Sequence, residues 1–231
     1  MKRDCMTQTQ RTATCKQSFK HTFVLSDIHV TTAEPVHPKD PLWRRYKQKD
    51  FFIDDQFNKF LDKVHTICSD GPGELVLAGD IFDFDGVTQL PLKHKFKLSW
   101  LERLRGLNSE ERKSRFKMKL IIADHPVFFD ALSAFIKRGH SCIFVIGNHD
   151  LELHWPSVRN LVLNRLKLTD EEKDRVIFNN FFYISQNDTL IEHGNQHDSH
   201  SNCPNPINPK IRGLKRERIR LPFGSFANRY M

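Results

Sequence analysis

Four short motifs carry side chains that can bind metal ions. They present carboxylate, imidazole or amide donors, and in chain order they are Asp27-Ile28-His29, Gly79-Asp80-Ile81-Phe82-Asp83, Gly147-Asn148-His149-Asp150 and His193-Gly194. Carboxylate, imidazole and amide oxygen ligands together suit divalent transition metals. Two such ions about 3.5–4 Å apart form a symmetric clamp for displacement at phosphorus. The residue types therefore indicate metal-dependent chemistry on phosphate esters.

Each motif follows a short apolar segment, which must position it. The segments are 23–26, 75–78, 142–146 and 189–192. Such runs are typical of buried strands, and α/β folds place their ligands at strand ends. For residues 147–150 alone, a Gly-Asn turn with a His that caps a helix explains the sequence equally well. The recurrence of the pattern after four strands favours one shared site.

Between the strands, apolar residues recur at helical spacing. Residues 51–69 are predicted to form an amphipathic helix that Gly71-Pro72-Gly73 ends, which gives a right-handed strand–helix–strand crossover. Residues 91–123 are also predicted to be helical, and their inward stripe is predicted to be Leu98, Leu101 and Leu104.

Further elements are predicted toward the C-terminus. Pro126 starts a helix that ends at Gly139, Pro156 starts another, and Thr169 caps a third. Short strands are predicted at 176–178, 181–185 and 189–192, with a hairpin turn at 186–188. A Pro-containing loop at 31–41 would pass over the site, and its His37 is interpreted as a solvated loop residue.

Composition indicates one globular domain. The chain has 231 residues, 39% of them hydrophobic and 28% charged, with a formal charge of +8 that suits polyanionic partners. Residues 1–20 form a polar, flexible tail without the apolar segment of a secretory signal, and residues 21–231 form the domain. The five scattered cysteines are typical of reduced thiols in the cytoplasm. No apolar run approaches the roughly 20 residues that span a bilayer.

The order Asp-x-His, Gly-Asp-x-x-Asp, Gly-Asn-His-Asp and a lone His before Gly resembles the calcineurin-like metallophosphoesterases, from about residue 20 to residue 200. The resemblance implies an α/β fold of the α+β four-layer type, with two mixed β-sheets packed face to face and helices outside. Residues 191–196 look most like the bacterial branch near the UDP-2,3-diacylglucosamine pyrophosphohydrolases.

The resemblance also implies a two-metal centre. Asp27 and His29 would bind the first ion, Asp80 would bridge both, and Asn148 and His193 would bind the second. The expected cofactors are two divalent ions, Mn²⁺ in the first place, with Fe, Zn or Ni as alternatives. The ions would acidify a bound water into a hydroxide nucleophile.

Three further residues receive roles by the same resemblance. His149 would be the general acid at the leaving oxygen, and Asp150 would keep it oriented. Asp83 would lie behind the ligands and steady His29.

One part of the family pattern is missing. The family ends with Gly-His-x-His, which supplies one ligand to each metal, and the residues after His193 contain no such motif. The nearest imidazoles are His197 and His200, which are candidate extra ligands. The chain is therefore expected to be naturally short or truncated, with C-terminal strands missing from one sheet.

These observations favour a metal-dependent phosphoesterase that acts on a phosphomonoester, a phosphodiester or a pyrophosphate. One alternative is a truncated, catalytically weak fold relative that binds phosphate ligands or partners. A second alternative is a nuclease. The expected substrate is a phosphorylated small molecule or a lipid-linked one.

A basic run near the C-terminus contributes to the expected partners. It spans 210–220 and contains Lys210, Arg212, Lys215, Arg216, Arg218 and Arg220. One interpretation is a solvated helix face. The other is an anchor for anionic membrane headgroups or nucleic-acid backbone, which would place a cytoplasmic protein peripherally at the inner membrane face.

Overall fold

The computed structural model describes residues 19–34, 47–91, 96–211, 213 and 216–230. Of the tail predicted at 1–20, only residues 19–20 fall within these ranges, and His37 lies outside them.

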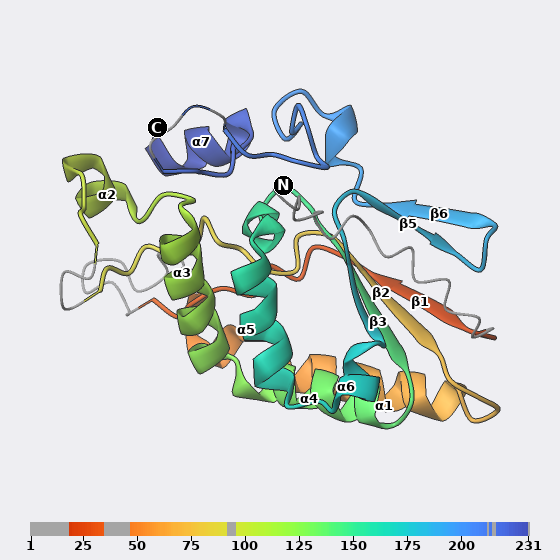
Figure 1. The fold of residues 1–231 in the computed structure, drawn as a ribbon. Coiled ribbons are helices and arrows are strands. Elements are labelled where there is room, and N and C mark those ends of the chain that lie inside the picture. The colour runs from red at the N-terminus through yellow and green to blue at the C-terminus, as the bar shows by residue number, and fades with distance from the viewer. Residues whose placement is uncertain (1–18, 35–46, 92–95, 212, 214–215, 231) are drawn as a thin grey trace, which may run out of the picture.

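A four-stranded parallel sheet forms the centre of the molecule (Figure 1). Its strands, in spatial order, are β1 (Thr22–Leu25), β2 (Glu74–Ala78), β3 (Ser141–Val145) and β4 (Val176–Asn179). The register aligns Leu25 with Leu77 and Leu77 with Phe144. Because the strands are parallel, their carboxyl ends meet at one edge, as the motif positions require.

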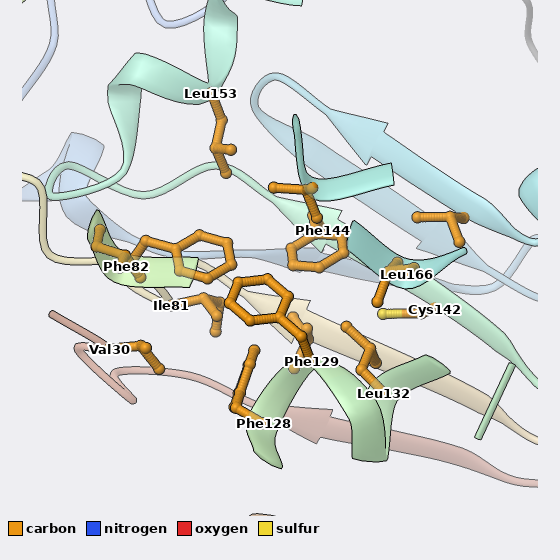
Figure 2. Close-up of a cluster of buried hydrophobic side chains, with 14 of the residues drawn as sticks. Val30, Ile81, Phe82, Phe128, Phe129, Leu132, Cys142, Phe144, Leu153 and Leu166 are labelled. Carbon is orange, nitrogen blue, oxygen red and sulfur yellow. The ribbon is translucent and has the colours of Figure 1, made fainter. Parts of the chain in front are cut away.

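Helices cover one face of this sheet. They are α1 (Asp54–Ile67), α3 (Glu111–Asp124), α4 (Pro126–Lys137) and α5 (Pro156–Leu166). Figure 2 shows the resulting core, in which Phe82 lies parallel to Phe129 at 5.9 Å between ring centroids and to Phe144 at 6.1 Å. Several aromatic rings thus fill the space between the helices and the sheet.

A two-stranded antiparallel sheet packs on the opposite face. It consists of β5 (Phe182–Ser185) and β6 (Thr189–Glu192). Along β2, Leu75 and Leu77 belong to the helix-side core, while Val76 and Ala78 pack in a second cluster with Ile191 of β6. Alternation along a strand therefore gives the sheet two buried faces.

The predicted α/β class, with two packed sheets and flanking helices, is confirmed. The sheets were predicted to be mixed, but within the described residues the first is purely parallel and the second purely antiparallel. The predicted hairpin turn at 186–188 is present: Asp188 N donates to Ser185 O at 3.1 Å, and the two central residues of this turn, Gln186 (51°) and Asn187 (65°), have the positive φ that a type I′ turn requires.

The region 91–123 differs from its prediction. Two helices are described there, α2 (Trp100–Arg105) and α3, and Gly106 separates them with a φ of 84° that ends α2. Leu101 and Leu104 are exposed, so the predicted inward stripe is wrong. The structural reason is that α2 is anchored by a buried polar residue, Glu102, instead of by its leucines.

The remaining elements are short. They are the 3-10 helices η2 (Lys49–Phe51), η3 (Leu151–His154) and η4 (Asn195–His197), and the helices α6 (Asp170–Lys173) and α7 (Phe223–Tyr230). The described part of the basic run is not helical, because Lys210 bridges to Ile219 and Arg218 bridges to Glu110 in extended conformation. Among the helices of the described residues, none has the length and apolar character needed to cross a membrane.

Candidate metal centre

Three of the predicted ligands occupy a left-handed backbone conformation. The φ angles are 55° at Asp27, 53° at His29 and 53° at Asp80. Only a few per cent of non-glycine residues adopt positive φ, and each costs on the order of 1 kcal/mol. The backbone N–H of Asp27 donates to Gly79 O at 3.1 Å and that of His29 donates to Asp80 O at 3.0 Å. The ends of β1 and β2 thus hold each other in a conformation that aims these side chains together.

Two glycines allow close approach at the same edge. A Cβ atom on Gly79 would lie 2.6 Å from His193 Cβ, and one on Gly147 would lie 2.9 Å from His193 Cδ2 and collide with the Asp80 carboxylate. Both positions therefore require the absence of a side chain. His193 itself arrives from the end of β6, so the second sheet completes the site.

The donor atoms of the predicted ligands converge on Asp80. Its Oδ2 lies 3.2 Å from His193 Nε2 and 3.8 Å from His29 Nε2. Asp27 Oδ1 is 3.9 Å from His29 Nε2, and Asn148 Oδ1 is 3.2 Å from His193 Nε2. All five predicted ligands are therefore brought together.

Two overlapping groups of donors result, and Asp80 belongs to both. One group contains Asp27, Asp80 and His193, and the other contains His29, Asp80 and His149. This grouping differs from the predicted one, which paired Asp27 with His29 and excluded His149. The shared position of Asp80 agrees with the predicted bridge, while the separate ligand roles stay predictions.

The residues fit divalent cations. Donors held about 2.0–2.2 Å from a transition metal lie roughly 3–4 Å from one another, the spacing seen around Asp80 Oδ2. The imidazole of His193 donates from Nδ1 to Ala78 O at 3.0 Å, which turns its Nε2 toward Asp80 and Asn148. Such a backbone acceptor is the usual orienting partner of a metal-binding histidine.

The electrostatics of the site also favour positive charge. Burial alone would lower the pKa of His193, but its hydrogen bond with Asp80 and the charge of that carboxylate raise it to about 9. In the opposite direction, burial would raise the pKa of Asp80, and His193 holds it below its usual value. A divalent cation would neutralise the same Asp80 carboxylate that here keeps His193 protonated.

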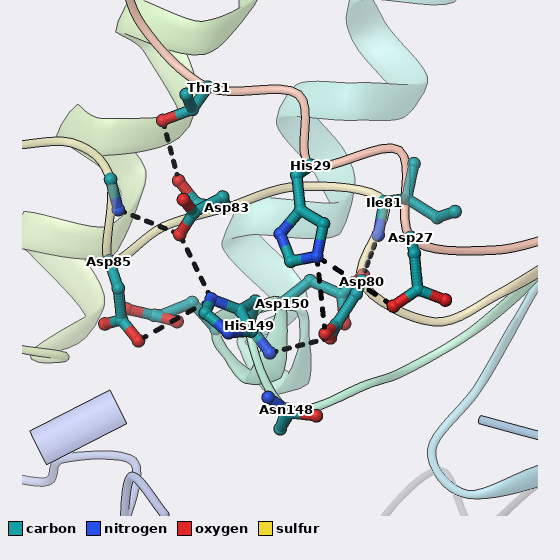
Figure 3. Close-up of polar contacts among 12 residues, drawn as sticks. Asp27, His29, Thr31, Asp80, Ile81, Asp83, Asp85, Asn148, His149 and Asp150 are labelled. Carbon is teal, nitrogen blue, oxygen red and sulfur yellow. Dashed lines mark hydrogen bonds and ion pairs between the residues drawn. The ribbon is translucent and has the colours of Figure 1, made fainter. Parts of the chain in front are cut away.

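His149 is oriented by Asp83 and not by Asp150, which corrects two predicted contacts (Figure 3). Its Nδ1 donates to Asp83 Oδ1 at 3.2 Å, and its backbone N–H donates to Asp80 Oδ1 at 2.8 Å. Burial would lower the pKa of His149, but Asp83, then Asp80 and Asp85, raise it to about 9. The structure describes no hydrogen bond between Asp83 and His29.

Asp150 has a structural position instead. Its buried carboxylate accepts from Gly147 N at 2.6 Å and from Ile81 N at 3.0 Å, which ties the loop after β3 to the loop after β2. Burial, and next the negative charge of Asp80, raise the pKa of Asp150. Asp150 therefore fixes the backbone around the site.

Two residues near the site were not predicted. Asp85 Oδ2 lies 4.0 Å from His149 Nδ1, and Thr31 Oγ1 donates to Asp83 O at 2.9 Å. Asp85 follows Asp83 at a spacing of two in an acidic loop, and this was the signal available in the sequence. Thr31 gave no such signal, because its role depends on the folding of its loop over residues 83–86.

His197 and His200 lie outside both donor groups. Their side chains are 76% and 69% exposed, and they pair with Glu192 at 2.7 Å and Asp198 at 3.6 Å. The structure thus does not place these candidate extra ligands in the centre.

The carboxyl edge of the parallel sheet thus gathers Asp, His and Asn donors that fit a divalent metal ion. The family model for calcineurin-like phosphoesterases matches residues 20–220. Since this is most of the chain, the protein belongs to the calcineurin-like phosphoesterase family, whose members are metal-dependent phosphoric ester hydrolases. Comparisons with curated proteins and with solved structures gave no match.

Proposed function

We propose that the chain hydrolyses phosphate esters at a two-metal centre in which Asp80 is the shared ligand. One observation carries this proposal: Asp80 Oδ2 lies within 3.8 Å of two imidazole nitrogens that come from different strand ends. His193 follows β6, and His29 follows β1. A carboxylate between two sets of donors can hold two cations close together.

The proposed ligands divide around Asp80. Asp27, His193 and Asn148 would hold one ion, and His29 would hold the other on the side that faces His149. When bound, the two ions would lower the pKa of water and compensate the charge that develops on the phosphoryl group. We propose Mn²⁺, which carboxylate donors suit. Fe, Zn and Ni are the alternatives, because imidazole donors suit them.

His149 is the proposed proton donor to the leaving oxygen. Its Nδ1 is bound to Asp83, which fixes the ring and leaves Nε2 to act on a substrate. Asp83 is in turn fixed by Gly86 N at 2.8 Å. Asp83 is therefore proposed as the positioning residue for His149.

The substrate is proposed to be a phosphomonoester, a phosphodiester or a pyrophosphate. The similarity of residues 191–196 to the UDP-2,3-diacylglucosamine pyrophosphohydrolase branch supports the pyrophosphate. Assays should therefore include one substrate of each kind.

The test combines metal analysis with hydrolysis of p-nitrophenyl phosphate, bis-p-nitrophenyl phosphate and a nucleoside diphosphate sugar. We expect two ions per chain, loss of hydrolysis on chelation and recovery with Mn²⁺. One ion or none, without hydrolysis under any of the four metals, would instead support a phosphate-binding protein. Cleavage of DNA or RNA in preference to the small esters would support a nuclease.

A further inference from the structure

Helix α2 exposes its apolar side chains and buries a carboxylate. Trp100 is 72% exposed and Leu104 68% exposed, the two highest values among the exposed large hydrophobic residues described, whereas Glu102 is 5% exposed. Trp100 and Leu104 are four residues apart and therefore lie on one helix face. Leu101 adjoins them at 36% exposure. This polarity is the reverse of an ordinary surface helix.

Polar contacts hold α2 in this orientation. The Glu102 carboxylate accepts from Ser99 N at 3.0 Å, from Asn108 N at 3.1 Å and from Lys113 Nζ at 2.6 Å. Ser99 Oγ in return accepts from Glu102 N, which completes a capping box. Because the buried side of the helix is satisfied by these bonds, its apolar side is left facing outward.

Basic side chains lie on α2 and beside it. Arg103 and Arg105 are exposed on α2 itself. Arg216 and Arg218 reach Glu110 at 3.5 and 3.3 Å, beside Lys113, and their side chains remain 60% and 45% exposed. A hollow of about 410 Å³ lies between α2 and this segment, lined by Lys97, Leu98, Ser99, Glu102, Glu110, Lys113, Arg216 and Arg218.

We propose that this face docks on a lipid bilayer that contains anionic phospholipids. The docking surface, termed the α2 surface, consists of Trp100, Leu101, Arg103, Leu104 and Arg105. Leucine side chains gain by leaving water for the acyl region, tryptophan favours the headgroup boundary, and arginines attract anionic headgroups. A nucleic acid would engage the arginines and the indole but would leave both leucines in water.

The α2 surface is joined to the framework of the metal centre. A Cβ atom on Gly106, which ends α2, would lie 3.2 Å from Val87 O, just beyond the loop that carries Asp83 and Asp85. Figure 1 places α2 at the edge of the molecule, away from both sheets. The docking proposal does not depend on the hydrolytic activity, so each can fail without the other.

Cosedimentation of the full chain with vesicles tests the proposal. We expect binding to phosphatidylcholine vesicles that contain phosphatidylglycerol, and little binding to pure phosphatidylcholine. The W100S/L104S variant should lower the partition constant roughly tenfold or more, because two apolar side chains no longer leave water. The R103Q/R105Q variant should weaken binding and reduce its dependence on salt.

Matched controls keep the test specific. Leu190→Ser changes a leucine on β6 that is 59% exposed and far from α2 in sequence, and it should leave binding unchanged. All variants should melt at the wild-type temperature and hydrolyse a soluble ester at the wild-type rate.

Several results would overturn the docking proposal. One is failure of the wild type to bind anionic vesicles. Another is an equal loss of binding in Leu190→Ser and W100S/L104S. Duplex DNA binding that needs Arg103 and Arg105, without vesicle binding, would assign the surface to nucleic acid. A dimer abolished by W100S/L104S, again without vesicle binding, would assign it to self-association.

Discussion

Two of the clusters in which the chain buries carboxylates differ in their cationic partners. At the metal centre, Asp80 lies against the imidazoles of His193 and His29. Beneath α2, Glu102 lies against Lys113, which also reaches Glu110 at 3.1 Å. Both clusters neutralise buried negative charge. Only the first does so with groups that can also give up a proton and bind a metal through the same nitrogen.

The backbone conformation also distinguishes the two clusters. At the metal centre, three candidate ligands have positive φ, whereas Glu102 belongs to a regular capping box. Strained backbone persists where the surrounding structure enforces it, often at functional sites. Imidazoles beside ligands with strained backbone therefore mark the candidate site, whereas a lysine that pairs with the capping-box carboxylate of a neighbouring helix marks the scaffold.

The largest expected effect comes from Asp80→Asn. An amide removes the charge that would stand between two cations, so their mutual repulsion is no longer compensated. We expect hydrolysis to fall by about 10³-fold or more and bound metal to decrease. The measurement is kcat/KM on the best ester found, beside metal content. Asp170→Asn, at an exposed carboxylate paired with Lys173, is the control and should be neutral. Full activity in Asp80→Asn would remove Asp80 from the bridge.

His149→Ala tests whether that imidazole is a proton donor or a ligand. If it donates to the leaving oxygen, turnover should fall by about 10²–10⁴-fold while metal content stays at the wild-type level. The structure makes this a real alternative, because His149 also belongs to the donor group of His29 and Asp80. Joint loss of metal and activity would reassign His149 as a ligand.

The sequence predicted the strand ends because the signals there are local. A buried strand such as Cys142 to Val145 is a short apolar run, and the polar residues after it can only lie at the sheet edge. The hairpin turn at 186–188 is equally local, since Asn tolerates positive φ. The meeting of His193 with Asp80 is not local, and it came from the family resemblance.

Two errors show what local signals omit. Leu101 and Leu104 have the spacing of an inward apolar stripe, but an outward-facing stripe has the same spacing. The ion pair of Glu102 with Lys113, on the next helix, turns Glu102 inward and leaves the two leucines exposed. Asp150 adjoins His149 in sequence, yet its carboxylate turns to Gly147 N, and Asp83 reaches the imidazole from another loop. The folding of the loops, and not proximity in sequence, determines which carboxylate contacts His149.

Lys113→Ala probes the scaffold cluster. Removing the ammonium leaves Glu102 buried without its cation, which should lower the free energy of unfolding by roughly 3 kcal/mol. Metal content per folded chain should not change. Lys119→Ala, an exposed position on the same helix, is the matched control and should stay within about 0.5 kcal/mol of wild type. Chemical denaturation measures both. Loss of metal in folded Lys113→Ala would show that the two clusters are coupled and would weaken the distinction drawn between them.

The smallest effect is expected for the H197A/H200A variant. These imidazoles also pair with carboxylates, Glu192 and Asp198, so pairing alone does not distinguish them from His193. What they lack is convergence, because both are largely exposed and neither belongs to a donor group around Asp80. A Mn²⁺ titration of the double variant should therefore match wild type in affinity and in activity. His29→Ala is the matched control, since it removes an imidazole that does converge, and it should weaken Mn²⁺ binding. If H197A/H200A loses metal as His29→Ala does, convergence in this structure is not what selects the ligands. The two histidines would then have to reach the centre by a movement of residues 195–200.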